Sequence, residues 1–533
     1  MGQHATSKSD RRNILFAGII IKIIGFLYRI PLTNLLGDEG QGYLSLALEL
    51  YILFLLLSSY AMNDTMSSFI SDKLRDGRNV KEAFLKALIP AAVYSLLIAL
   101  IFYALSDRIA SHLLGAPYTA YPMRVLAPAI FLFSISQCLR GYFNGIGAYT
   151  PSLISRILEQ IFVAFVALFG AASYLRTGRK LAEKEGVMAV KSAIGARGAA
   201  LGTLVGVICG LLFLIFVFVS HEKKVRRKKA FRHEYVRLAG RDLFAKVLPM
   251  ILGILAVNLQ GPMNALFYSR IASVQGTATR DIVIRWGLYD AKCGVWLRLP
   301  VGIAVTAGLL TLNACEGARS QDRSLSEAFR NSLLIAVIGA VTLFVFGGAL
   351  IECFYHGNVK LPAHMIRLSA VSVILYTLGV ISSTVLKRMG EEERAVKIAG
   401  ISLLVHLAML IVLLVFFKAG IFAVIGATLI SGFVFAFINL RIIEQRSRYR
   451  LNVVTFILKP LLEAFIAAVP SLVVYGVIRL VGRVEWATFF GILIWVIWLP
   501  VRFMRRGILK PEDMKKIPFG DQLYRFLKQH RWL

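Results

Sequence analysis

The apolar stretch from Asn13 to Leu36 constrains this chain most, because it is long enough to cross a bilayer and yet contains two full cations. A helix needs about 20 mainly apolar residues to span the hydrocarbon layer. Lys22 and Arg29 are seven residues apart, so on a helix they share one stripe, about 10 Å apart along the axis, together with Gly18 and Gly25. A cation near the bilayer centre costs about 2.5–3.5 kcal/mol. The stripe therefore predicts a polar cavity, a partner or a ligand beside it rather than lipid.

The composition is that of a multi-pass helical membrane protein. Of the 533 residues, 57% are hydrophobic and 17% are charged, and the mean hydropathy is +0.69. Repeated long apolar runs exclude a soluble protein. The net charge of +31 would favour nucleic-acid binding in a soluble chain, but the enrichment of cytoplasmic loops in lysine and arginine explains most of it here. We therefore expect membrane lipids, and no nucleic acid, as partners.

Cysteine and histidine patterns predict neither a disulfide nor a metal site. The cysteines fall in or at the ends of apolar runs without paired spacing, and the eight histidines form no ligand motif. No metal or other cofactor is expected. Residues 1–12 form a short basic leader, and no small-residue cleavage site follows the first apolar run. That run is therefore predicted to be a retained helix rather than a signal peptide.

Apolar runs bounded by charge predict about fourteen transmembrane helices. An even number places both termini on one side, and most of the lysines and arginines outside the spans lie on that side, which the positive-inside rule assigns to the cytoplasm. The chain is thus expected in the bacterial cytoplasmic membrane with both termini inside. The predicted spans are 13–36, 43–63, 82–106, 120–143, 151–175, 198–220, 246–270, 286–312, 328–352, 364–386, 396–417, 419–441, 456–480 and 485–504.

Two basic segments bear on this topology. The segment from Arg176 to Arg197 holds six cations but falls outside, so it is either a tolerated basic loop or a sign that one span is miscounted. The segment from Lys223 to Lys246, with KKVRRKK at its centre, is the strongest cytoplasmic anchor in the chain. It is either a topology determinant or a site for anionic lipid headgroups, and the first interpretation is favoured.

A faint internal repeat suggests two halves. Residues 134–168 can be laid over residues 380–414, since in each a helix ends in a basic residue, a turn with glycine follows and an apolar helix begins. This favours six helices plus six, with two more at the C-terminus. The predicted organisation is a cytoplasmic N-terminus at 1–12, an N-lobe at 13–220, a basic linker at 221–245, a C-lobe at 246–443, two helices within 456–504 as a groove for a lipid tail, and a basic tail at 505–533.

Polar residues in other spans extend the candidate cavity. Glu49 stands alone in the second span, and a pair with Arg29 or Lys22 would hold these charges while leaving one cation uncompensated. The alternative is that Arg29 reaches the membrane surface by snorkelling and Lys22 pairs with a carboxylate. In the seventh span Gln260, Asn264 and Tyr268 recur every fourth residue, with Asn258 nearby. Interhelical hydrogen bonding, worth about 0.6–2 kcal/mol, is the competing interpretation for these amides.

The eighth span contributes Asp290, Gly294 and Arg298 on one side, while Lys292 points roughly opposite to Asp290. Arg298 is therefore preferred over Lys292 as a cavity residue. The complete set of predicted substrate-binding residues is Lys22, Arg29, Glu49, Asn258, Gln260, Asn264, Asp290 and Arg298.

The most specific motif is RGYFNGIGAYTPSLISRILEQ, Arg140 to Gln160. It closely resembles the RGYFQG…TP…S…EQ block of the stage V sporulation protein B-like proteins. That family belongs with the lipid II flippases in the multidrug/oligosaccharidyl-lipid/polysaccharide (MOP) exporter superfamily. The stretch GFLYRIPLTNLLGDEGQGYLSL resembles the family's first helix and hairpin. The resemblance covers nearly the whole chain and is diffuse after residue 240. The chain departs from the family pattern at Asn144, where glutamine is usual, and at Lys292 and Arg298.

The motif also has a physical interpretation. Its glycines permit a tight cytoplasmic turn, and Pro151 can start the next helix without losing a backbone donor. Arg140 is placed to anchor in the inner headgroup layer, and Glu159 would pair with Arg156, three residues before it. We interpret the elbow as a cytoplasmic gate, with a merely rigid elbow as the alternative. The predicted gate residues are Arg140, Gly141, Asn144, Gly145, Pro151, Glu159 and Gln160.

The resemblance implies two six-helix lobes around a cavity that opens alternately to either side, and hence a transporter rather than an enzyme. The cationic stripe suits a lipid-linked pyrophosphate, because arginine meets phosphate in bidentate, charge-assisted hydrogen bonds. The expected substrate is undecaprenyl-pyrophosphate-linked sugar, above all the peptidoglycan precursor lipid II. No ATP-binding motif G-x-x-x-x-G-K-[ST] occurs, so the membrane potential or the gradient of an unidentified ion would drive transport. A monomer is expected.

Four alternatives stay open. A flippase for another polysaccharide precursor fits the same residues, whereas a drug or cation antiporter of the MATE type would favour an acidic cavity. A membrane glycosyltransferase or polymerase would need a larger outside domain or a carboxylate cluster, and the longest outside loop carries only Glu183 and Glu185. A structural partner in division or sporulation would tolerate neutralisation of every intramembrane charge. The basic tail with its aromatics lies on the inner membrane surface or is disordered.

Overall fold

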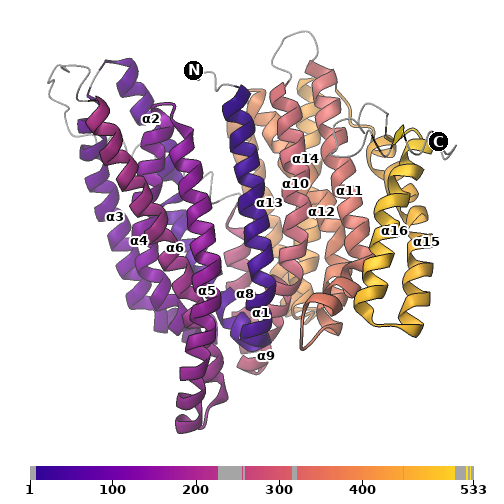
Figure 1. Cartoon of the computed structure of the whole chain (residues 1–533), viewed down its shortest axis with the longest axis horizontal. Helices are drawn as coiled ribbons and strands as arrows, with labels where there is room; N and C mark the ends of the chain where they lie inside the picture. Colours follow the sequence, from indigo (N-terminus) through magenta and orange to yellow (C-terminus); the bar gives the residue numbers. More distant parts are fainter. Residues whose placement is uncertain are drawn as a thin grey trace. The chain divides into compact units, whose positions relative to one another are not determined.

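The computed structural model describes residues 8–77, 79–225, 258–314, 321–447 and 449–509, with isolated positions elsewhere. Within these residues the secondary structure is helical, and 12 helices are long and apolar enough to cross a membrane (Figure 1). The prediction of an all-α multi-pass membrane protein is confirmed. The basic linker at 221–245 and the tail at 505–533 lie for the most part outside the described residues.

The chain packs into two compact units. The first comprises Met1–Lys292 with Ala399–Ala427, and the second Cys293–Ile398 with Thr428–Leu533. Two helices, α13 (Glu392–Val415) and α14 (Phe422–Arg446), pass from one unit to the other. The remaining elements of the first unit are α1 (Lys8–Ser58), α2 (Tyr60–Arg75), α3 (Val80–Arg108), η1 (Ile109–Leu113), η2 (Pro117–Thr119), α4 (Ala120–Gly145), α5 (Tyr149–Glu185), α6 (Met188–Val225), α8 (Gln260–Val274), α9 (Thr279–Gly287) and most of η3 (Leu288–Gly294).

The first two predicted spans form the single element α1, which bends sharply at Gly37. Gly37 has φ 70° and ψ 174°, a conformation that is essentially restricted to glycine. The 12 helices found among the described residues correspond to every predicted span except 246–270, because α1 merges two of the spans. The predicted span 246–270 lies partly outside the described residues.

The basic segment from Arg176 to Arg197 is not a loop. Helix α5 has 37 residues and α6 has 38, so each is about 55 Å long, well beyond the roughly 30 Å of a hydrocarbon core. The two helices meet at Gly186, which has φ 71°, and their joined ends reach past the neighbouring helices of the first unit (Figure 1). The segment is thus a helical extension and adds no span.

Close backbone contact holds α5 and α6 together. A Cβ atom built on Gly198 would lie 2.3 Å from the carbonyl oxygen of Gly170, and one on Gly202 would lie 2.7 Å from the Cβ of Ala167. No real side chain tolerates such distances. Small residues at helix contacts are typical of membrane proteins, where packing rather than the hydrophobic effect drives association.

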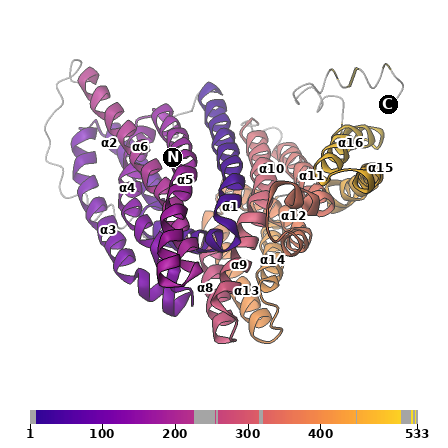
Figure 2. The same ribbon diagram turned by 60° about the horizontal axis from the view of Figure 1, so that its bottom comes forward.

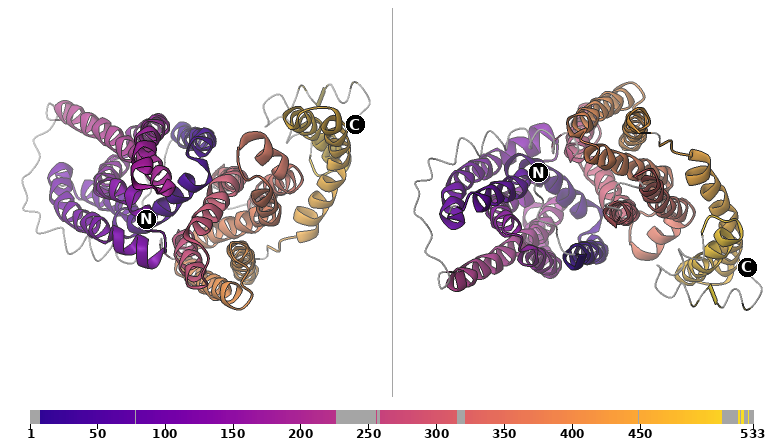
Figure 3. Two further views of the ribbon diagram at one scale, coloured as in Figure 1. Left: turned by 90° about the horizontal axis from the view of Figure 1, so that it is seen from below. Right: turned by 90° about the horizontal axis from the view of Figure 1, so that it is seen from above.

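In the second unit, α10 (Val295–Ala314), α11 (Gln321–Phe354) and α12 (Lys360–Arg388) pack together. The elements η4 (Val454–Leu458), α15 (Lys459–Val481) and α16 (Val484–Arg505) follow α14. Helices α15 and α16 run side by side and both contact α11 (Figures 2 and 3). The indole nitrogen of Trp495 donates to Thr342 Oγ1 at 3.0 Å.

Two ionic contacts close the inner face of the α15–α16 pair. Glu463 of α15 is buried; its Oε2 lies 2.7 Å from Arg502 Nε and its Oε1 lies 3.2 Å from Arg506 Nε. The opposite faces of these helices are apolar and exposed, with Val473 and Val477 on α15 and Phe489 and Val496 on α16 as examples. Such faces suit contact with acyl chains.

Candidate functional site

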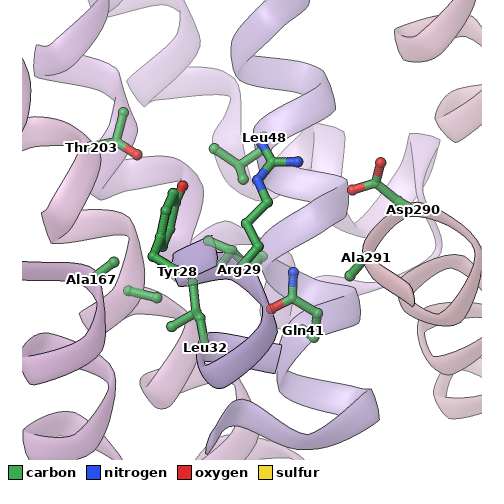
Figure 4. Close-up of a pocket in the computed structure, with 11 residues that line it drawn as sticks. Tyr28, Arg29, Leu32, Gln41, Leu48, Ala167, Thr203, Asp290 and Ala291 are labelled. Atoms are coloured by element: carbon green, nitrogen blue, oxygen red, sulfur yellow. The ribbon is translucent and has the colours of Figure 1, made fainter. Parts of the chain in front are cut away.

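A small pocket lies inside the first unit, against both arms of α1. Tyr28, Arg29 and Leu32 line it from the arm before Gly37, and Gln41, Leu44 and Leu48 from the arm after it. Ala167 of α5, Ala199 and Thr203 of α6, and Asp290 and Ala291 of η3 complete the wall (Figure 4). The bend at Gly37 therefore brings the cationic arm and the following arm to one pocket.

Tight packing fixes the second arm of α1. A Cβ atom on Gly42 would lie 2.1 Å from the carbonyl oxygen of Val283 in α9, and one on Gly40 would lie 3.2 Å from the carbonyl oxygen of Ser192 in α6. Any larger residue at Gly42 would push α9 away. The glycines after the bend thus set the distance from α1 to the helices that surround the pocket.

A buried ion pair positions the π-helical segment that carries Asp290. Lys292 is 1% exposed, and its Nζ lies 2.6 Å from Oδ1 of Asp38, just past the bend of α1. Because Asp290 is two residues away, this pair ties the pocket wall to α1. π-helical turns occur often at functional sites. Lys292 itself does not line the pocket.

The Arg29 side chain borders the pocket without an ionic partner among the described residues. It is half-buried, it lines the pocket, and its guanidinium forms no ion pair with any residue that the structure describes. Figure 4 shows the guanidinium and the Asp290 carboxylate directed toward one another across the pocket. Because an arginine keeps its charge at any accessible pH, this group offers fixed donors to an anion.

Gln41 adds an unsatisfied polar atom to the same pocket. It is 6% exposed; its Nε2 donates to Ser45 Oγ at 3.3 Å, and among the described residues its Oε1 has no hydrogen-bond partner. A buried amide oxygen without a partner is costly. If the amide is turned over, Oε1 accepts from Ser45 and the NH₂ group faces the pocket. Either way the pocket contains a polar group that water or a ligand can satisfy.

The other predicted cavity residues lie outside this pocket. Lys22 is exposed. Gly25, on the same stripe, faces α5: a Cβ atom built on Gly25 would lie 3.7 Å from Oε1 of Gln160. Asn258 is exposed at the edge of the undescribed segment. Arg298 belongs to the second unit and is exposed. Their predicted roles stay predictions.

Glu49 is buried against α8. A Cβ atom on Gly261 would lie 2.6 Å from Oε2 of Glu49, so the carboxylate fills the space that this glycine leaves. The predicted ion pair with Arg29 is not found among the described residues, and the pair with Lys22 stays a prediction. What the contact does show is that the second arm of α1 meets α8 at a carboxylate.

A second polar cluster, which we call the elbow network, joins α2, α4 and α5. Arg140 Nε donates to Ser155 Oγ at 2.9 Å, and Arg140 Nη2 donates to Glu159 Oε2 at 2.6 Å. Arg140 is 1% exposed. The prediction that Arg140 anchors in the headgroup layer was wrong, because its side chain is buried in the protein. The hydrogen-bonded partner of Glu159 is Arg140, while Arg156, the predicted partner, interacts with Glu159 electrostatically.

The elbow network continues through amides. Ser152 Oγ donates to Asn144 Oδ1 at 3.0 Å, Asn144 Nδ2 donates to Asn63 Oδ1 at 3.1 Å, and Asn63 Nδ2 donates to Gln137 Oε1 at 3.2 Å. The sequence analysis missed Asn63 and Gln137. A polar residue in the middle of an apolar run was the available signal.

The glycines of the motif act differently from the prediction. Gly147 alone has a positive φ, 78°. Gly141 and Gly145 lie within α4, where a Cβ would come 2.6 Å from the carbonyl oxygen of Asn63 and 2.7 Å from the Cβ of Ile70. They allow α2 to pack closely rather than form the turn. Pro151 lies in the first turn of α5, as a proline that starts a helix should.

A third polar cluster, the His406 cluster, joins α8 to α13. The Gln260 Nε2 and His406 Nδ1 atoms are 2.9 Å apart, and His406 Nε2 lies 2.7 Å from Asn264 Oδ1. The amide repeat of the seventh span therefore contacts a histidine of another helix. The sequence analysis missed His406, because a single histidine in an apolar run carries no spacing signal.

Two family models match the chain. A model described as polysaccharide biosynthesis protein matches residues 13–309, more than half of the sequence. The chain belongs to the polysaccharide biosynthesis protein family. A second model with the same description matches residues 302–471. The resemblance that the RGYFNG motif indicated is confirmed by this family membership.

Relatives and a solved structure agree with this family. The chain is 24% identical to the stage V sporulation protein B of Bacillus subtilis (strain 168), over 68% of this chain and 69% of the relative. It is 20% identical to the lipid II flippase MurJ of the same organism, over 73% and 74%. A MurJ structure in an inward closed conformation superposes with a TM-score of 0.67 at 15% identity, covering 92% of this chain and 99% of that one. The expected MOP-superfamily fold is confirmed.

Proposed function

We propose that this chain is a flippase that moves undecaprenyl-pyrophosphate-linked sugar, above all lipid II, from the inner to the outer leaflet by alternating access. One observation carries the proposal: in the pocket, the Arg29 guanidinium has no ion pair with a described residue. A guanidinium in a membrane-spanning unit is expensive unless it serves a ligand. A pyrophosphate can accept its paired donors in charge-assisted hydrogen bonds.

Gln41 and Asp290 give the pocket its other polar contacts. The Gln41 amide supplies either two donors for a phosphate oxygen or an acceptor for a sugar hydroxyl, depending on its orientation. The Asp290 carboxylate offsets the charge of Arg29 while the pocket is empty, and it is the acidic side chain on the wall. When a doubly charged pyrophosphate binds, Arg29 exchanges its weak interaction with the Asp290 carboxylate for a stronger one with the phosphate.

The pocket has to open before it can hold such a headgroup. Its volume is about 30 Å³, which suffices for one or two waters. Alternating access supplies that opening: Arg29 sits eight residues before the Gly37 bend, so a change in the bend moves the guanidinium relative to Gln41. The exposed apolar faces of α15 and α16 would contact the polyprenyl tail outside the cavity, so that only the polar head crosses.

The relatives support a lipid-linked substrate. The proposal also covers the energy source for transport and the oligomeric state. A relative named lipid II flippase covers about three quarters of the chain. No Walker-type ATP motif occurs in the sequence, so the energy would come from the membrane potential, worth about 2.3 kcal/mol per charge and 100 mV, or from an ion gradient. The chain would act as a monomer on membrane lipid.

A flipping assay with two opposed variants tests the proposal. Full-length protein is reconstituted in liposomes with fluorescent lipid II, and transfer to the outer leaflet is followed for wild type, Arg29→Ala and Asp290→Asn. We expect Arg29→Ala to slow transport about 10- to 100-fold, the equivalent of a charged hydrogen bond of roughly 1.5–3 kcal/mol, and Asp290→Asn to have a smaller effect. Arg108→Ala, at an exposed end of α3, is the matched control.

The same variants separate the flippase from a cation antiporter. Asp290 favours testing a cation antiporter as the second candidate function, because the binding site for a cationic drug needs an acidic side chain. An antiporter predicts that Asp290→Asn abolishes transport of a cationic dye while Arg29→Ala does not slow it. Full lipid II transport by Arg29→Ala, with loss of dye transport in Asp290→Asn, would overturn the proposal.

A further inference from the structure

We propose that His406 is the residue at which this transporter takes up the proton that drives it, with Gln260 and Asn264 as the groups that respond to its charge. The inference rests on the proposed function, since it names the source of energy for flipping. It starts from a buried titratable side chain that the pocket does not use.

The His406 ring lies between the side-chain amides of Gln260 and Asn264. It is 1% exposed, and both ring nitrogens are engaged by amides one helical turn apart on α8. The first turn of α14, Phe422–Ala427, has no titratable side chain, and from it the Ala427 carbonyl interacts with the ring. An ionisable residue at such a place in a membrane helix is a functional candidate by default.

The hydrogen-bond geometry assigns one proton to the ring. Nε2 lies 2.7 Å from Asn264 Oδ1, an acceptor, so Nε2 carries the proton. Nδ1 then accepts from the NH₂ group of Gln260, 2.9 Å away. The two amides as oriented here are complementary to a neutral imidazole, and this assignment follows from the amide orientations. The Ala427 carbonyl is a further acceptor for a ring N–H.

A second proton would reverse one of these contacts. With Nδ1 protonated, both ring nitrogens are donors, and the NH₂ group of Gln260 faces another donor. Gln260 has to turn its amide so that Oε1 accepts, or α8 has to move away. Proton uptake thus changes the contact between α13 and α8 at Gln260, which is half-buried and is the first residue of α8.

The new charge also needs a counter-ion, and Glu49 places a carboxylate against α8. Its Oε2 fills the space at Gly261, the residue after Gln260. An imidazolium attracts this carboxylate, which belongs to the arm of α1 that lines the pocket with Leu44 and Leu48. Protonation of His406 is therefore linked to the pocket through α8 and Glu49, in a step that forms and breaks no bond other than the N–H bond of the ring.

The alternative is that the His406 cluster only holds α8 to α13, because buried side-chain hydrogen bonds between membrane helices are common. A structural role predicts loss of stability in variants without any change in the response to pH. A proton site predicts a changed response to pH in protein that is still folded.

Transport with a pH difference across the liposome membrane tests the proposal. For wild type we expect acid on the side of substrate release to speed flipping by up to about tenfold per pH unit, because one pH unit across the membrane is worth a factor of ten per proton. His406→Gln keeps a hydrogen-bonding amide and removes the titration, so its rate should not respond to the gradient. His112→Gln, which replaces an exposed histidine at the end of α3, should respond as wild type does.

A second variant and a direct measurement keep the test decisive. Gln260→Glu places a carboxylate next to Nδ1 and should move the pH profile of flipping to higher pH, even if His406→Gln does not fold. Nitrogen NMR of ¹⁵N-histidine-labelled protein in nanodiscs, without substrate, should show the ring of His406 passing from one proton to two between pH 4 and pH 8.

Each outcome decides. A ring that keeps one proton over the whole range, or His406→Gln that responds to the gradient as wild type does, overturns the proton site. A ring that gains a proton in protein that transports no lipid-linked sugar leaves the proton site standing and overturns the proposed function instead.

Discussion

Arg29 and Arg140 are two arginines inside the same membrane unit, and their surroundings differ completely. Arg140 is 1% exposed, and Ser155 and Glu159 receive its donors. Arg29 is half-buried, borders a pocket, and has no ion pair with a described residue. The fold has thus neutralised one cation and kept the other available. An intramembrane charge is evidence for a ligand site only after its partners are known.

The RGYFNG motif also lies apart from the pocket, since none of its residues lines it. The elbow network pairs Arg140 with Ser155 and Glu159, and Asn144 with Asn63 and Ser152. These contacts join α2, α4 and α5 and leave no donor of Arg140 directed at a headgroup. The elbow then serves as a stiff connection, and its proposed role in gating would operate through helix movement.

The largest expected effect is on stability. Arg140→Ala leaves the part-buried Glu159 without its hydrogen-bonded partner, so we expect a loss of about 1.5–3 kcal/mol, seen as a lower Tm in detergent or nanodiscs. Arg29→Ala should leave Tm within about 1 °C of wild type. The double variant Arg140→Met with Glu159→Gln should recover most of the loss. Equal Tm values for Arg140→Ala and wild type would remove the distinction between the two arginines.

A smaller effect is expected at the bend of α1. Gly37→Ala forces an alanine into φ 70° and ψ 174°, at a cost of about 1–3 kcal/mol. We expect reduced transport, since the two arms no longer meet correctly at the pocket, with a modest fall in Tm. Gly77→Ala, at a positive φ of 69° in the turn after α2 with no atom near its Cβ, is the matched control. If both variants lose equal stability but transport normally, the bend does not position Arg29.

Periodicity was sufficient to predict most of the fold. The apolar runs predicted the membrane helices, and the Lys22–Arg29 stripe directed attention to the helix that lines the pocket. The merger of two spans into α1 and the long α5–α6 extension were not predicted, because charge marks the end of a membrane span but not the end of a helix. Gly37 and Gly186 are the only local signals for where these helices turn.

The sequence could not predict which side chains form hydrogen bonds or ion pairs with the polar residues of the helices. Glu159 was assigned to Arg156 on the same helix, yet Arg140, nineteen positions away in sequence, reaches it. Asn264 was placed in a cavity, yet it contacts His406, 142 positions away. Helix periodicity gives the face of a residue but not which helix covers that face. Asp290 and Arg29 were both predicted as cavity residues, and both border the pocket.

The most direct test of the account is the affinity of folded protein for the pyrophosphate headgroup. Undecaprenyl pyrophosphate is titrated into nanodiscs that hold wild type, Arg29→Ala or Arg29→Lys, and the Kd is taken from ligand-induced thermal stabilisation. We predict a Kd about 10- to 100-fold higher for Arg29→Ala, with Arg29→Lys in between because lysine cannot donate in a bidentate fork. An unchanged Kd in Arg29→Ala, at unchanged Tm without ligand, would contradict the claim that this arginine is kept available for phosphate.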